Sequence, residues 1–163
     1  MKDVLDKLSS YNIFNYLLPG VVFVALAELF LSRSFIQKDV LVGLFFYYFI
    51  GMIISRVGSL VVEPLLKKTS FVCFAAYADF VNVTKTDPKV EVLSEQNNMY
   101  RTFCALFILL IFLRIYEAIE DWCPVIKKAT PFIAVIFLVI LFLFSYRKQT
   151  LYITKRVEAN RLL

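Results

Sequence analysis

The chain has 163 residues, of which 60% are hydrophobic, and its mean hydropathy is +0.73. Soluble domains are only about 45–50% apolar, so this composition indicates a membrane protein of one domain. The net charge is +5 and there is no histidine. Without histidine, and without an HExxH or GxSxG motif, the chain has no recognisable set of catalytic side chains. We expect a non-enzymatic protein with no cofactor.

Three cysteines are scattered as Cys73, Cys104 and Cys123, without the CxxC spacing of zinc or redox motifs. We therefore expect no metal site and three unpaired thiols. An intermolecular disulfide through Cys123 in an oxidising compartment is the alternative.

Four long apolar segments, each flanked by charge, are expected to cross a membrane, which takes about 20 helical residues. The first is longer than a secretory h-region of roughly 7–15 residues and no cleavage site follows it, so we expect it to be retained. The predicted fold class is all-α: four transmembrane helices, with helices extending into the cytoplasm. The predicted spans are residues 13–31, 40–62, 102–116 and 130–146.

The distribution of lysine and arginine predicts the orientation of the chain. In the predicted topology, twelve lysine and arginine residues lie on the same side of the membrane as the N-terminus, and four lie on the other side. Both termini are therefore expected in the cytoplasm, in a bacterial inner membrane, with the basic residues near anionic lipid headgroups. Direct nucleic-acid binding is not expected, because the basic residues are dispersed over three segments.

Taken in chain order, residues 2–10 suit a short amphipathic helix at the inner interface. Pro19 and Gly20 are expected to bend the first span, as a static bend or as a hinge. The second helix is expected to end near Pro64.

The second span carries small residues at helical spacing, which lets membrane helices approach closely. They are Gly51, Ser55 and Ser59, with Gly58 beside them. The pattern predicts helix packing, either within one chain or between subunits. We expect self-association along this stripe, and replacement of Gly51 and Ser55 by leucine to disrupt assembly.

The middle segment, residues 67–98, is predicted to be cytoplasmic. Its apolar residues recur at helical spacing, which favours an amphipathic helix; a hairpin pairing residues 80–84 with 89–93 is the alternative. The third helix is expected to begin at Ser94 or Glu95 and to run to about residue 119. The fourth is expected to begin near Thr130 and Pro131 and to continue as a cytoplasmic helix over residues 147–163.

The aromatic surface of the middle segment must be covered by the membrane interface, by another copy or by a partner. Together with the basic tail it forms a predicted docking face for a cytosolic protein. Its residues are Phe74, Tyr77, Phe80, Arg147, Lys148, Lys155 and Arg156.

Ionisable residues inside spans suggest function. Glu28 and Arg114 fall at similar depths in the first and third spans, so we expect them to pair, with Glu117 one turn from Arg114 as a second acid. The pair could fix helix register, line a pore or substrate path, or remain exposed.

Four stretches of the chain carry a resemblance to a known family: YNIFNYLLPG, ISRVGSLVVEPLLKK, LSEQNNMYR and SYRKQT. With its four spans and inward-protruding helices, the chain resembles the membrane subunit of the Kiwa anti-phage defence system. The resemblance implies an oligomeric membrane sensor that holds a cytosolic, DNA-binding effector. It transfers no individual functional residue.

The leading functional hypothesis is a membrane sensor or anchor that self-associates and docks a soluble effector, in anti-phage defence. The alternative is a pore-forming effector that depolarises the membrane. A third hypothesis is a structural subunit of a larger membrane complex.

Overall fold

A computed structural model describes residues 12–161, and over this range the chain is helical, without a strand. The predicted all-α fold is confirmed. The helix predicted over residues 2–10 lies outside the described residues, as do the last two residues of the predicted tail helix. The described elements are η1 (Ile13–Leu17), α3 (Leu18–Phe30), α4 (Val40–Val57), η2 (Gly58–Val62), α5 (Glu63–Lys68), α6 (Tyr77–Thr86), α7 (Lys89–Trp122) and α8 (Pro124–Arg161).

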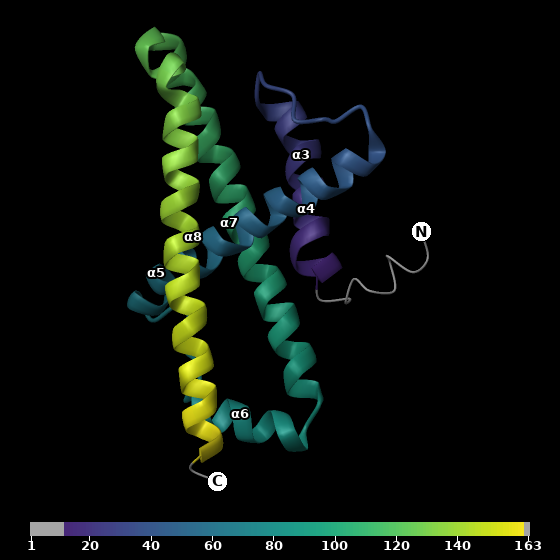
Figure 1. Cartoon of the computed structure of the whole chain (residues 1–163), viewed down its shortest axis with the longest axis vertical. Helices are drawn as coiled ribbons and strands as arrows, with labels where there is room; N and C mark the ends of the chain where they lie inside the picture. Colours follow the sequence, from purple (N-terminus) through teal and green to yellow (C-terminus); the bar gives the residue numbers. More distant parts are fainter. Residues whose placement is uncertain (1–11, 162–163) are drawn as a thin grey trace.

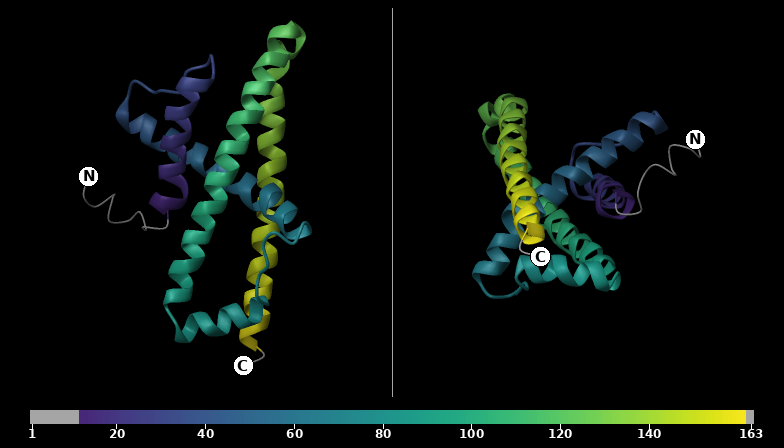
Figure 2. Two further views of the ribbon diagram at one scale, coloured as in Figure 1. Left: turned by 180° about the vertical axis from the view of Figure 1, so that it is seen from behind. Right: turned by 60° about the horizontal axis from the view of Figure 1, so that its bottom comes forward.

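These elements join into four continuous helices that are long and apolar enough to cross a membrane: Ile13–Phe30, Val40–Lys68, α7 and α8. The first helix and α7 run in one direction, and α4 and α8 return in the other (Figure 1). The helices α7 and α8 form a long antiparallel hairpin, whereas α4 crosses the bundle obliquely. Both views of Figure 2 show α6 bridging the ends of that hairpin opposite its turn.

Two prolines follow π-helical turns at the same spacing. Pro19 and Pro64 are each the second residue after such a turn, η1 and η2 respectively. Proline lacks an N–H donor and its ring clashes with the carbonyl four residues earlier in a regular α-helix. The wider π-helical turn just before each proline removes the α-helical hydrogen bond that the proline would break. The predicted end of the second helix at Pro64 is therefore wrong, and the helix continues to Lys68.

The glycines of the first two helices bring their backbones into contact. A Cβ atom on Gly51 would overlap the carbonyl oxygen of Tyr16, and one on Gly20 would overlap the carbonyl oxygen of Tyr47. A Cβ on Gly58 would lie 3.2 Å from the carbonyl oxygen of Arg101 on α7. Close approach of this kind is what small residues permit in membranes.

The small-residue stripe of α4 and η2 thus lies at contacts within one chain. Ser55 and Ser59 are also buried. Self-association stays a prediction, but the stripe predicted to mediate it is already occupied by the first helix, by α7 and, at Ser59, by α8.

The core lies where the first helix, α4 and α7 meet. Ala27, Ile54 and Leu106 are at most 1% exposed. By contrast, only 11% of the apolar stretch of α8 is buried within the chain, against 39% for the first helix. The large apolar side chains of α8 therefore face outward, as expected for a helix with a lipid-exposed surface.

Several predicted boundaries differ from the structure. The middle segment is irregular between the end of α5 at Lys68 and the start of α6 at Tyr77, so Phe71 and Phe74 do not lie on a helix. Residues 80–84 and 89–93 are helical, so the hairpin alternative is wrong. The third helix begins at Lys89 and not at Ser94. The backbone N–H of Lys89 donates to the Asp87 carboxylate at 2.9 Å. This side-chain acceptor satisfies a free N–H at the helix start.

The fourth helix begins at Pro124 and not near Thr130, and it contains Pro131. The helices α7 and α8 are therefore joined at Cys123, without the short loop predicted between about residues 119 and 130. Its continuation as a helix past Tyr146, as far as Arg161, is confirmed.

The glycine contact generates a testable prediction. Gly51→Ala is expected to lower the free energy of unfolding by about 1–3 kcal/mol, because the added methyl group forces the two backbones apart. The measurement is unfolding of the purified protein in mixed micelles. Gly43→Ala is the matched control in the same helix, because a Cβ there meets its nearest atom at 3.4 Å, an ordinary contact. Equal stability of the two variants would contradict the packing described here.

Candidate functional site

Polar side chains gather at two levels along the helices. One group surrounds Glu63 and the other surrounds Glu120; we call them the Glu63 cluster and the Glu120 cluster. On α7 their members Arg101 and Glu120 are separated by about 28 Å of helix. The hydrocarbon core of a bilayer is about 30 Å thick, so the two clusters are spaced as the two interfaces of a membrane would be.

The Glu120 cluster ties the first loop to the α7–α8 hairpin. The Glu120 carboxylate pairs with Arg33 and accepts a hydrogen bond from the Thr130 hydroxyl. The Thr130 hydroxyl also lies 2.9 Å from the hydroxyl of Tyr116. Glu120 is 2% exposed, so the charge of Arg33 and the Thr130 hydroxyl compensate its desolvation.

The predicted pair between Glu28 and Arg114 is wrong. Arg114 lies 3.6 Å from Glu117, and Glu117 also accepts hydrogen bonds from the backbone N–H of Ser32 at 3.1 and 3.2 Å. Glu28 is exposed and forms no ion pair within residues 12–161. The neighbouring Ala27 is the residue that faces the core, and successive helical residues point about 100° apart, so Glu28 points away.

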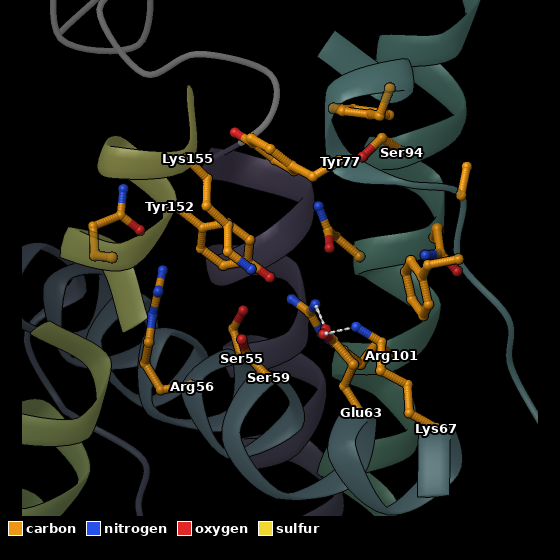
Figure 3. Close-up of a pocket in the computed structure, with 16 residues that line it drawn as sticks. Ser55, Arg56, Ser59, Glu63, Lys67, Tyr77, Ser94, Arg101, Tyr152 and Lys155 are labelled. Carbon is orange, nitrogen blue, oxygen red and sulfur yellow. Dashed lines mark hydrogen bonds and ion pairs between the residues drawn. The ribbon is translucent and has the colours of Figure 1, made fainter. Parts of the chain in front are cut away.

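The Glu63 cluster is a carboxylate shared by three cations. Glu63 Oε2 lies 2.5 Å from Arg101 Nη1, and Glu63 Oε1 lies 3.0 Å from Lys67 Nζ and 3.5 Å from Lys148 Nζ. Glu63 is 6% exposed. Its partners come from α5, α7 and α8, so one buried charge connects three helices. Figure 3 shows the ion pairs with Lys67 and Arg101.

Lys148 also satisfies a carbonyl that the second helix leaves free. The N–H of Glu63 is bonded to the carbonyl of Gly58, and Pro64 has no N–H to offer. The carbonyl of Ser59 therefore lacks both its α-helical and its π-helical donor. Lys148 Nζ donates to that carbonyl at 2.6 Å and to the Ser59 hydroxyl at 2.8 Å.

A cavity of about 530 Å³ opens beside this cluster (Figure 3). Its charged lining consists of four basic side chains, Arg56, Lys67, Arg101 and Lys155, and one acid, Glu63. The rest of the lining is mostly polar or aromatic: Ser55, Ser59, Phe74, Ala75, Tyr77, Phe80, Ser94, Asn97, Asn98, Gln149 and Tyr152. The second helix, the segment before α6, and helices α6, α7 and α8 all contribute.

Aromatic rings form one wall of the cavity. The rings of Tyr77 on α6 and Tyr152 on α8 lie 5.9 Å apart, and Lys67 Nζ lies 4.0 Å from the centre of the Phe74 ring. Contacts of this geometry are favourable. The first joins α6 to α8, and the second joins the segment before α6 to the end of α5.

The structure divides the residues of the predicted docking face into two groups. Lys148 and Tyr77 contact other parts of the chain, and Phe80 is half-buried beside Tyr77. The others are exposed: Phe74, Arg147, Lys155 and Arg156. Lys148 therefore holds helices together within the chain.

Sequence reasoning missed Glu63, Arg101, Glu120 and Thr130. The available signal for the first was Lys67, because an acid and a lysine four residues apart on a helix can pair. The other two partners, Arg101 and Lys148, are 38 and 85 residues away from Glu63, and no local pattern identifies them.

Within residues 12–161, no group of three or more histidine, cysteine or acidic side chains is placed to hold a metal ion. The three cysteines are free thiols. Comparison of the chain with protein-family models, with curated proteins and with solved structures gave no match.

The shared carboxylate generates a second prediction. Glu63→Gln is expected to lower the free energy of unfolding by about 2–3 kcal/mol, because three cations lose the charge that compensates them. Lys67 and Lys148 remain partly exposed, which limits the effect.

The matched control is Glu91→Gln, at an exposed acid of α7 with no ion pair within the described residues, which is expected to change stability by less than about 0.5 kcal/mol. Equal effects of the two variants, measured by unfolding in mixed micelles, would show that Glu63 does not hold the helices together.

Proposed function

We propose that the chain is a non-enzymatic membrane anchor that docks a soluble protein partner on the cytoplasmic side of a bacterial inner membrane, in a sensing role. The resemblance noted above adds the proposal that this role belongs to anti-phage defence.

The observation that carries the proposal is a helical frame beyond the apolar part of the bundle. We define the frame as α6 with residues 89–101 of α7 and 147–161 of α8. With 34 and 38 residues, α7 and α8 are about 51 and 57 Å long, well beyond the roughly 30 Å of a hydrocarbon core. The bridging helix α6 packs against both of them (Figure 1).

The frame presents apolar side chains outside the predicted spans. Leu151, Ile153 and Val157 on α8 are 53%, 58% and 48% exposed. Arg156 lies beside Ile153 and Val157, and Arg147 lies one turn from Leu151 on the other side of the helix. Neither arginine forms an ion pair within residues 12–161. Exposed apolar residues rimmed by charge are typical of protein-interaction surfaces. This surface suits a partner with an acidic rim.

The orientation proposal rests on charge. The frame and α5, together with the segments that link them, hold ten lysine or arginine residues and six acids. The opposite end of the bundle, which carries the loop after α3 and the α7–α8 turn, is poorer in basic residues. Under the positive-inside rule the frame lies in the cytoplasm. No observation within residues 12–161 favours the pore-forming alternative.

The native cysteines can be used to test the orientation of the chain in the membrane. In spheroplasts, a membrane-impermeant maleimide is expected to react with a variant that retains only Cys123, and not with one that retains only Cys73. Cys73 is exposed, so it is expected to react once the cells are permeabilised. The reverse pattern would overturn the orientation, and labelling of both from outside would contradict a bundle that spans the membrane.

The docking proposal is tested by affinity purification from the native host in mild detergent. A soluble protein is expected in fixed ratio with the wild type. The recovery of that protein is expected to fall at least tenfold for the double variant Arg147→Glu, Arg156→Glu, because the reversed charges repel an acidic surface. The matched control is Lys127→Glu, Lys128→Glu, which changes the net charge equally at two exposed positions on the other end of α8.

The same protein, purified separately, is expected to bind the wild-type chain in detergent. Cysteine labelling verifies that neither variant has inverted in the membrane. Recovery of the chain alone, or equal loss with both double variants, would contradict docking on the frame.

A further inference from the structure

We infer that the cavity beside Glu63 is a binding site for an anionic phosphate group, carried either by a phospholipid headgroup or by a soluble phosphorylated compound. This inference does not depend on the docking proposal, because it concerns the inside of the frame and not its outer surface.

The charge of the residues that line the cavity is the first argument for phosphate binding. Four cations face one carboxylate across the cavity, and Lys148 adds a fifth at its edge. A single carboxylate compensates one of these charges. The remaining excess of positive charge lies in a concave site with low-dielectric walls, where its attraction for an anion is stronger than on an open surface.

Two of these cations are not engaged by any acid of residues 12–161. Lys155 forms no ion pair within this range, and the Arg56 guanidinium donates to the Tyr16 hydroxyl at 2.8 Å. Arg101 bonds Glu63 through Nη1, while its buried Nε–H has no hydrogen-bond acceptor among the described residues. Donors of this kind, with serine hydroxyls beside them, match the oxygens of a phosphate.

The level of the cavity along the helices is the second argument. It starts at Arg56 and Glu63, where the apolar stretch of the second helix ends, and reaches Lys155, about 10 Å farther along α8 than Lys148. This is the level of the headgroups of one leaflet. Basic pockets between helices at this level bind anionic lipid headgroups.

The aromatic wall of the cavity is the third argument. Phe74, Tyr77 and Tyr152 form this wall, with Lys67 against the Phe74 ring. Such a wall accommodates the glycerol and upper acyl carbons of a lipid, or a planar group on a soluble compound. At about 530 Å³ the cavity is large enough for either.

The test uses the purified chain in a non-ionic detergent. Phosphatidylglycerol is the lipid probe, phosphatidylcholine is the lipid of zero net charge, and inorganic pyrophosphate is the soluble probe. The thermal stability of the wild type is expected to rise with phosphatidylglycerol or with pyrophosphate, and not with phosphatidylcholine, because binding to the folded state stabilises it. Native mass spectrometry is expected to show one retained phosphatidylglycerol if the source is lipid.

The double variant Arg56→Gln, Lys155→Gln is expected to weaken binding roughly tenfold or more, as expected for the loss of two cations near the phosphate. Its matched control is Arg161→Gln, Lys68→Gln, which removes one arginine and one lysine from exposed positions outside the cavity. The charge-retaining double variant Arg56→Lys, Lys155→Arg is expected to keep binding.

Binding of phosphatidylglycerol alone would assign the site to a lipid headgroup, and binding of pyrophosphate would assign it to a soluble phosphate. The inference is overturned if neither probe stabilises the wild type more than phosphatidylcholine does. It is also overturned if the control weakens binding as much as the cavity variant, because the attraction would then belong to the general surface charge.

Discussion

The packing of the helices at the end of the bundle that carries the frame depends on the buried carboxylate of Glu63. It accepts from Lys67 on its own helix, from Arg101 on α7 and from Lys148 on α8. Hydrogen-bonded ion pairs of this kind are strongly directional. They also require every partner to stay in place, because a buried charge that loses its partner is costly. The crossing of three helices is therefore fixed at one level, and the cavity beside it has a defined shape.

Two backbone irregularities make this arrangement possible. The π-helical turn η2 lets the second helix continue through Pro64, which carries Glu63 and Lys67 beyond the apolar stretch. The same proline leaves the carbonyl of Ser59 without a helical donor, and Lys148 fills that role at 2.6 Å. A local departure from α-helical geometry thus becomes a contact between distant segments. Irregular turns inside helices often mark functional sites, and here one borders the cavity.

The two polar clusters give the molecule two different ends. The Glu120 cluster holds a short loop against the α7–α8 turn and encloses buried acids. The Glu63 cluster opens into a basic cavity and continues into the frame. Between them the side chains that face outward are largely apolar, as lipid requires. The basic cavity and the exposed residues of the frame therefore lie at the same end, where the proposed anionic ligand and protein partner would meet the same three helices.

The sequence by itself determined the fold class, the four apolar helices and the helical continuation of the last one, because these follow from hydropathy, span length and local propensity. It also identified the small residues of the second helix. Only the tertiary structure decided which partners these residues meet. Gly51 lies against Tyr16, and the charge at position 28 turns away from Arg114 because Ala27 faces the core. Glu63 and Lys148 are 85 residues apart, and only the helix crossing brings them together. Local spacing predicts which face a residue occupies on its helix, but the neighbour across that face depends on how the helices cross.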